Sequence, residues 1–131
     1  PAGSPYPYHY HYPDGSAHAR MPGMGPELYE ATRARFADLP GVRVSRGAVP
    51  AVLAGNAPDR IAFLHVDMNN AEAEIGALEA LFDRVSPGGM IVLDDYGYQG
   101  YRAQRDAERA WFAARGYDVL ELPTSQGVVI R

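Results

Sequence analysis

The chain contains no cysteine and no lysine. Without cysteine, disulfide bonds, thiolate zinc sites and cysteine nucleophiles are excluded. All 12 basic side chains are arginines, and together with 16 acidic side chains they leave a net charge of −4. This balance disfavours nucleic acid as the main partner, because duplex binding usually needs a basic face. No apolar run approaches the ~20 residues of a membrane span and no signal peptide is recognisable, so a cytoplasmic protein is expected.

Two motifs that would indicate a class of protein are also missing. A nucleotide-binding sheet would carry a glycine-rich loop between a strand and a helix. Gly23-Met24-Gly25 does not qualify, because no strand pattern precedes it and Pro26 follows it at once. The G-x-S-x-G motif of many serine hydrolases is absent as well, which disfavours that class.

The first 26 residues differ in composition from the rest. They hold 6 prolines and 4 glycines, a density that opposes helix and central strand, so a flexible segment or surface loop is expected. A lid that binds substrate through its tyrosines is the alternative. His9 and His11 share a side if extended, but no further ligand accompanies them, which disfavours a metal pair. Because the chain begins at Pro1, we expect a processed or longer product.

The length of 131 residues and a hydrophobic content of 47% predict one globular domain, expected over residues 27–131. Pro26 suits the first turn of a helix, where its missing N–H costs nothing. This helix is predicted to run to about Leu39, with Leu28, Thr32 and Phe36 on its buried side.

Short apolar runs bounded by turn residues predict five strands. They cover residues 42–45, 61–66, 90–93, 118–122 and 127–130. The connection between the last two is too short for a parallel crossover, so these two are predicted to be antiparallel. The alternation of strands and helices predicts an α/β fold with a mostly parallel sheet and an antiparallel C-terminal strand.

Two amphipathic helices are predicted between these strands. Asn69 and Glu72 have the spacing of a capping box, which marks the start of the first, and the run Ser86-Pro87-Gly88-Gly89 marks its end. The second is predicted over residues 101–115, with Gly116 as its stop. Its inward side chains are predicted to be Ala103, Ala107, Ala110, Trp111 and Ala114.

Two of the strands end in aspartate, which is the most informative feature of the sequence. Asp67 follows one strand, and Asp94 and Asp95 follow the next. Ligands of open α/β sheets bind beyond the carboxyl ends of the strands, so a metal site or a general base is predicted there. Both Asp94 and Asp95 can face one ion only if the chain leaves strand geometry; otherwise one of them is structural. An all-oxygen ligand set favours magnesium, calcium or manganese over zinc.

His65 and three tyrosines lie near these aspartates in sequence. His65 is two residues before Asp67, where a base is conceivable, although a satisfied core histidine is the favoured interpretation. Tyr96, Tyr98 and Tyr101 either wall an aromatic or sugar pocket or cover the edge of the sheet.

The runs HVDMN, AEAEIGALEALFDRVSPGGMIVLDDYG and LPTSQGVVI resemble those of the macrocin O-methyltransferase-like class I S-adenosylmethionine-dependent methyltransferases. The resemblance extends from about Val42 to Arg131. It implies a Rossmann-like sheet of seven strands, of which the last is antiparallel and the first ones are missing here. The family's first strand, its glycine-rich loop and the acidic residue after its second strand are not recognisable in this chain.

The resemblance also implies a reaction and its residues. Asp67, Asp94 and Asp95 match the positions that bind Mg²⁺ in these enzymes, and Asp67 would double as general base. Arg46, Gly47 and Ala48 fall where these folds approach the adenine of S-adenosylmethionine. The small-molecule substrate would be a sugar or another small natural product that is methylated on a hydroxyl group.

Two alternatives stay open beside the methyltransferase. A non-catalytic interaction module would use the strand 61–66, whose open edge invites pairing with a second copy and hence a homo-oligomer. A metal-binding remnant of the fold would use the three aspartates without methyl transfer. The methyltransferase hypothesis predicts that the reading frame extends upstream into a strand and a glycine-rich loop, since this chain alone is not expected to be complete for activity.

Overall fold

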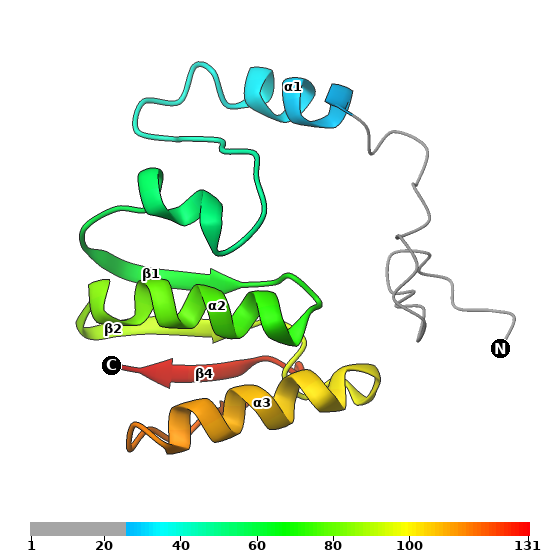
Figure 1. Ribbon diagram of the computed structural model, residues 1–131, viewed down its shortest axis with the longest axis vertical. Helices are drawn as coiled ribbons and strands as arrows, with labels where there is room; N and C mark the ends of the chain where they lie inside the picture. The colour runs from blue at the N-terminus through cyan, green and yellow to red at the C-terminus, as the bar shows by residue number, and fades with distance from the viewer. Residues whose placement is uncertain (1–25) are drawn as a thin grey trace, which may run out of the picture. The chain divides into compact units, whose positions relative to one another are not determined.

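The computed structural model describes residues 26–131. The expectations for the N-terminal segment, including His9, His11 and the run Gly23-Met24-Gly25, lie outside the described residues. By its internal contacts the chain divides into two compact units, Pro1–Arg46 and Gly47–Arg131. Figure 1 shows the elements of both units in chain order.

The first unit contributes one helix, α1 (Pro26–Arg35). It begins at Pro26, as predicted, but ends before Leu39, and the predicted burial is wrong because both Leu28 and Phe36 are exposed. The strand predicted at 42–45 is also wrong, since these residues are irregular. A strand needs a hydrogen-bonded neighbour, and none of the described strands pairs with this segment.

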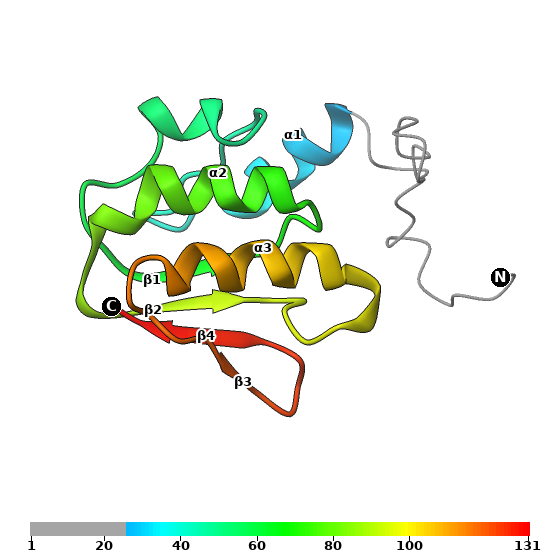
Figure 2. The same cartoon turned by 60° about the horizontal axis from the view of Figure 1, so that its bottom comes forward.

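The second unit is built on a sheet of four strands in the order β1-β2-β4-β3. The strands are β1 (Ile61–Val66), β2 (Val85–Leu93), β3 (Leu120–Glu121) and β4 (Gly127–Ile130). β1 and β2 are parallel, whereas β4 is antiparallel to both β2 and β3. The sheet is therefore mixed, with β4 as the reversed strand, and Figures 1 and 2 show β1 at one edge. The predicted antiparallel pairing of the last two strands is confirmed.

β2 begins five positions earlier than the sequence pattern predicted. Its first residue is Val85, which pairs with Ile61 and is fully buried. The run 86–89, predicted to end a helix, lies inside the strand instead. An irregularity in register between Ile61 and Phe63 accommodates it, and Gly88 has a φ of 81°, which glycine adopts without strain. Strand pairing thus overrides the turn propensity of this run.

Two helices, α2 (Ala71–Leu81) and α3 (Arg102–Ala113), cover the same face of the sheet (Figure 2). Short 3₁₀ helices lie at Ala51–Gly55, Phe82–Arg84 and Gln99–Tyr101. The apolar core lies between the helices and the sheet. Its buried members include Leu78, Phe82, Val85, Ile91, Leu93, Trp111, Phe112 and Val129.

The inward face of α3 differs from the predicted one. Trp111 is buried, as predicted, but the other buried residues are Gln104, Glu108 and Phe112, and none of the predicted alanines is fully buried. The two large aromatic side chains set the orientation of the helix, because they bury the most apolar area. The positions one and two turns before Phe112 then face inward as well, although they hold Glu108 and Gln104.

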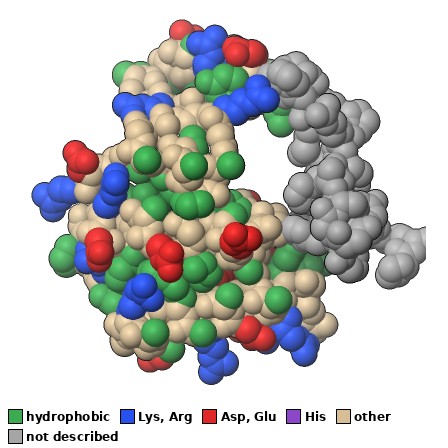
Figure 3. All heavy atoms as spheres, viewed as in Figure 1, with side chains coloured by type: hydrophobic (Ala, Val, Ile, Leu, Met, Phe, Trp, Pro, Cys, Tyr) green, Lys and Arg blue, Asp and Glu red, His purple; other side chains and the backbone are tan. Residues whose placement is uncertain are grey.

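The face formed by α2 and α3 carries acidic and basic side chains interspersed with apolar ones, as Figure 3 shows. Among the described residues, no helix is long and apolar enough to cross a membrane.

Candidate metal centre

The pairing of β1 with β2 brings two of the aspartates to one edge of the sheet. Val66 and Leu93, the last residues of the two parallel strands, are register partners. The residues that follow them are Asp67 and Asp94, and the backbone N–H of Asp94 donates to the carbonyl oxygen of Val66 at 3.0 Å. Both carboxylates therefore leave the sheet at the same end, where ligands of open α/β sheets bind.

Asp95 joins them because the chain leaves strand geometry after Leu93. Residues 94–97 form a turn. The Tyr98 N–H donates to the Asp95 carbonyl at 3.0 Å, and the Gly97 N–H ties the turn to the Ser125 carbonyl at 2.7 Å. Consecutive residues of a turn need not point to opposite sides, which was the condition for both aspartates to face one ion. One carboxylate oxygen each from Asp67, Asp94 and Asp95 lies within 4.8 Å of the other two.

This arrangement fits a hard divalent cation. Mg²⁺, Mn²⁺ or Ca²⁺ holds oxygen ligands at about 2.0–2.6 Å, so oxygens with the spacing found here can surround one ion after small side-chain rotations. Asp67 is exposed and the other two are half-buried, which leaves room for water and for an oxygen of another ligand. Without a cation, three carboxylates this close repel one another. Metal binding stays a prediction.

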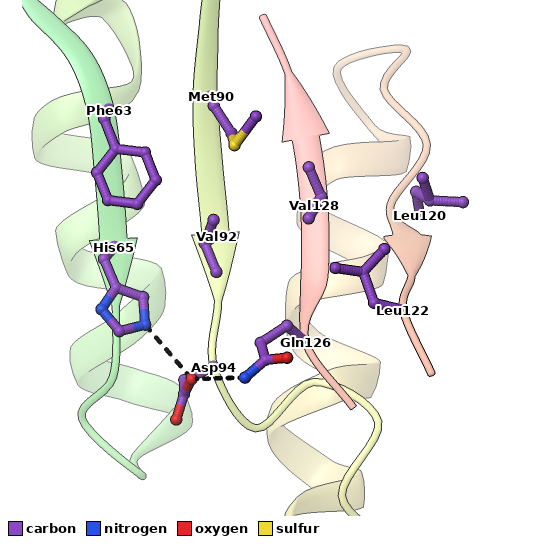
Figure 4. A pocket seen from close by; sticks show the side chains of 9 residues that line it. All are labelled: Phe63, His65, Met90, Val92, Asp94, Leu120, Leu122, Gln126 and Val128. Atoms are coloured by element: carbon purple, nitrogen blue, oxygen red, sulfur yellow. Dashed lines mark hydrogen bonds and ion pairs between the residues drawn. The ribbon is translucent and has the colours of Figure 1, made fainter. Parts of the chain in front are cut away.

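Two polar side chains hold Asp94 from neighbouring strands (Figure 4). Gln126 donates through Nε2 to Asp94 Oδ1 at 3.1 Å, and His65 Nε2 lies 3.4 Å from the same oxygen. The favoured interpretation of His65 as a core residue is wrong, because its side chain is half exposed on the sheet face away from the helices. Gln126 was not recognised as a site residue. Its position directly before β4, the strand that pairs with β2, could have indicated that its side chain lies near Asp94.

These polar groups form one end of a pocket of about 610 Å³ on that open sheet face. Figure 4 shows side chains from four neighbouring segments on the same side of the sheet. Apart from His65, Asp94 and Gln126, the lining is apolar: Phe63, Met90, Val92, Leu120, Leu122 and Val128.

The loop between Asp67 and α2 is organised differently from the prediction. The helix cap is Asn70, whose side chain accepts from the Ala73 N–H at 3.0 Å, and Asn69 is not the cap. Asn69 has a φ of 54° and its side-chain nitrogen lies 3.5 Å from Asp67 Oδ1. The sequence pattern could not separate two adjacent asparagines, and only the backbone conformation decides between them.

The three tyrosines after Asp95 have separate roles. Tyr96 is buried in the core, whereas Tyr98 is exposed and its ring centroid lies 5.7 Å from that of Tyr101. Burial, followed by the negative charge of Asp95, raises the pKa of Tyr101 to about 12. Tyr101 is therefore a neutral phenol near the aspartates at physiological pH. That Tyr98 and Tyr101 wall a pocket stays a prediction.

The residues predicted to approach the adenine lie on either side of the boundary between the two units. Arg46 ends the first unit, and Gly47 and Ala48 begin the second. All three are exposed. A side chain at Gly47 would collide with Val52, since an added Cβ would stand 2.7 Å from its side-chain carbons. Their role in cofactor binding stays a prediction.

The chain matches known proteins in two comparisons. The family model of TylF, macrocin O-methyltransferase, matches residues 29–116. The chain is also similar to a solved apo structure of CalS11, a TDP-rhamnose 3'-O-methyltransferase and an enzyme in calicheamicin biosynthesis. The TM-score is 0.55 at 21% identity over 66% of this chain, which supports the likeness of fold, and the match spans 40% of that enzyme. No curated protein matches the chain in sequence.

Proposed function

Because the chain belongs to the TylF family of macrocin O-methyltransferases, we propose that its aspartate cluster serves metal-assisted O-methyl transfer. The methyl donor would be S-adenosylmethionine, and the acceptor a hydroxyl group of a sugar or another small natural product. The observation that carries this proposal is the convergence of three carboxylates at the carboxyl ends of two neighbouring parallel strands.

Asp67, Asp94 and Asp95 would hold a Mg²⁺ ion. When bound, this ion supplies Lewis acidity, which lowers the pKa of the acceptor hydroxyl, and a template that orients it. Asp94 is suited to a fixed ligand, because His65 and Gln126 both contact its Oδ1.

Asp67 is the most exposed of the three and is suited to contact the acceptor. In the proposed reaction it takes the proton of the acceptor hydroxyl as general base. The acceptor oxygen then forms a bond to the methyl carbon of the sulfonium. The carbon–sulfur bond breaks, its electron pair stays on sulfur, and S-adenosylhomocysteine is released.

Methyl-donor binding is the less complete part of the proposal. The chain spans 40% of the solved methyltransferase that it matches, and the family's glycine-rich loop is not recognisable in the sequence. Within this chain we propose that Arg46, Gly47 and Ala48 approach the adenine. Metal binding and donor binding therefore require separate measurements.

Calorimetric titration of Mg²⁺ and then of S-adenosylmethionine into the purified chain tests both parts. We expect one Mg²⁺ per chain in the wild type and none in Asp67→Asn. The control Asp59→Asn removes an exposed aspartate elsewhere in the same unit and should bind as the wild type does. Donor binding that depends on Mg²⁺ would support methyl transfer by this chain. Metal binding without donor binding would limit its function to the metal site, and the absence of both would refute the proposal.

One observation favours a second function, that of an interaction module. Among the described strands, β1 lies at the edge of the sheet and pairs with β2 alone. An unpaired apolar edge can add a strand of a second copy. Light scattering coupled to size-exclusion chromatography measures the mass, and a stable dimer that a proline at Phe63 abolishes would support this alternative.

A further inference from the structure

A second group of acidic side chains lies near the aspartate cluster but inside the protein. Glu74 on α2 and Glu108 on α3 are both 0% exposed, and Gln104 beside them on α3 is buried as well. Glutamates are almost never fully buried unless a partner satisfies them, because moving a carboxyl group out of water is costly. Two of them between one pair of helices therefore require an explanation.

Glu74 contacts the loop that carries Asp67. Its Oε1 accepts the backbone N–H of Met68 at 2.9 Å and that of Asn69 at 3.0 Å. These are the first two amides after Asp67, and Asn69 has the left-handed φ of 54° that few residues adopt readily. Capping of α2 does not explain this contact, because Asn70 already provides the cap. The Glu74 side chain thus binds the backbone of a loop outside its own helix.

Glu108 interacts with Glu74 from the neighbouring helix α3. Among the described residues, neither Glu74 Oε2 nor either Glu108 oxygen has a hydrogen-bond donor as a partner, since two ionised carboxylates can only accept. A hydrogen bond between the two carboxyl groups would satisfy these oxygens, and it requires one of the groups to carry a proton. Burial, the hydrogen bond to Glu74 and its negative charge raise the pKa of Glu108 to about 10. At neutral pH Glu108 is therefore protonated and can donate toward Glu74.

We propose that Glu74 and Glu108 form a carboxylate–carboxylic acid pair that positions Asp67. Glu108 orients Glu74, Glu74 holds the amides of Met68 and Asn69, and these amides fix the backbone from which the Asp67 carboxylate projects. Both glutamates are positioning residues, since neither belongs to the group of carboxylates that can share an ion. The effect on metal affinity rests on the proposed function, whereas the effect on the loop does not.

Two substitutions at Glu108 separate this role from simple packing. Glu108→Gln keeps a donor toward Glu74 Oε2, because an amide N–H replaces the carboxylic acid. Glu108→Leu has a similar size but no donor. Both remove the titrating group equally. The control Glu72→Gln removes an exposed carboxylate from α2, the helix that carries Glu74.

Amide hydrogen exchange in the metal-free protein provides the first readout. We expect protected amides at Met68 and Asn69 in the wild type, in Glu108→Gln and in Glu72→Gln, and at least tenfold faster exchange in Glu108→Leu. The amide of Ala73 is an internal reference, because it donates to Asn70 and should not change. Equal exchange at Met68 and Asn69 in all four proteins would overturn the proposal.

Binding of Mn²⁺, followed by electron paramagnetic resonance, provides the second readout. Groups that orient a metal ligand typically change affinity by about 10–100-fold, so Glu108→Leu should bind Mn²⁺ at least tenfold more weakly while Glu108→Gln retains wild-type affinity. If the wild type binds no Mn²⁺, the proposed metal site fails, but the exchange data still decide on the loop. If the exchange changes and the affinity does not, the positioning of Asp67 is refuted.

If Glu108→Leu fails to fold, infrared spectroscopy tests whether the buried pair carries a proton. The wild type at neutral pH should show the carbonyl stretch of a buried, protonated carboxylic acid, and Glu108→Gln should lack it. A wild-type spectrum without this band would show that the pair does not share a proton, which overturns the proposal.

Discussion

The two faces of the sheet are both apolar, yet their side chains differ in burial. Ile91, Leu93 and Val129 face α2 and α3 and are at most 1% exposed. Phe63 and Met90, on the opposite face, are 60% and 40% exposed. Alternation along a strand decides on which face a residue lies, but only a covering layer removes it from water. An apolar strand sequence alone therefore does not establish that both faces of a sheet are covered.

The polar side chains are divided between the two faces of the sheet in the same way. The covered face holds the carboxyl pair Glu74–Glu108, and the open face holds His65 and Gln126 against Asp94. The aspartate cluster lies at the end of the strands, where solvent has access. Burial raises the pKa of Glu108 in the carboxyl pair, whereas the aspartate cluster is accessible to a cation from solvent. The following predictions test this contrast.

The largest effect is expected for Phe112→Ala on the covered face. Phe112 is fully buried and its ring centroid lies 5.0 Å from that of Trp111. Truncating a buried phenylalanine lowers the free energy of unfolding by about 3–5 kcal/mol. Urea denaturation followed by the fluorescence of Trp111, the single tryptophan, measures the loss. A loss no greater than that of Phe63→Ala on the open face would contradict the contrast.

Metal binding should produce the next largest effect. At a Mg²⁺ concentration 100 times the Kd, mass action raises the free energy of unfolding by about 2.7 kcal/mol. The rise should be absent in Asp67→Asn and present in Asp59→Asn, and thermal unfolding with and without Mg²⁺ measures it. Stabilisation of Asp67→Asn as large as that of the wild type would exclude Asp67 as a ligand.

The buried pair predicts a dependence of stability on pH. The folded-state pKa of Glu108 is raised from 4.5 to about 10, so between these values the folded chain binds more protons than the unfolded one. The contribution of Glu108 to the free energy of unfolding is fully present below its unfolded-state pKa and is lost as the pH rises toward its folded-state pKa. The free energy of unfolding falls by at most about 1.4 kcal/mol per pH unit on this account. Urea unfolding of the wild type across this pH range should show a free energy of unfolding that falls with pH, and Glu108→Gln should lack this fall. Equal pH dependence of the free energy of unfolding in the wild type and in Glu108→Gln would refute this prediction.

The smallest effect is expected for Phe63→Ala on the open face. Because this side chain is already 60% exposed, its truncation should change the free energy of unfolding by about 0.5 kcal/mol or less. The same substitution should reduce the binding of a fluorescent dye that detects exposed apolar surface. A loss of several kcal/mol would mean that another part of the protein covers this face in solution.

Local pattern was sufficient for several elements. β1 and β4 have the predicted bounds, and α1 begins at Pro26. These signals are local, because apolar runs, proline and turn residues act on their own neighbourhood. The pattern failed where a distant partner decides: at the start of β2, which pairs with β1, and on the inward face of α3, which two aromatic side chains orient.

The sequence by itself determined the family resemblance, which the match over residues 29–116 confirms, and it determined that an aspartate follows each of two strands. Only the tertiary structure decided that Asp67, Asp94 and Asp95 converge, that His65 contacts Asp94, and that Glu74 and Glu108 lie together inside the protein. The physical reason is distance along the chain. Sequence fixes local conformation through neighbours, whereas strand pairing and helix packing bring together side chains that are tens of residues apart.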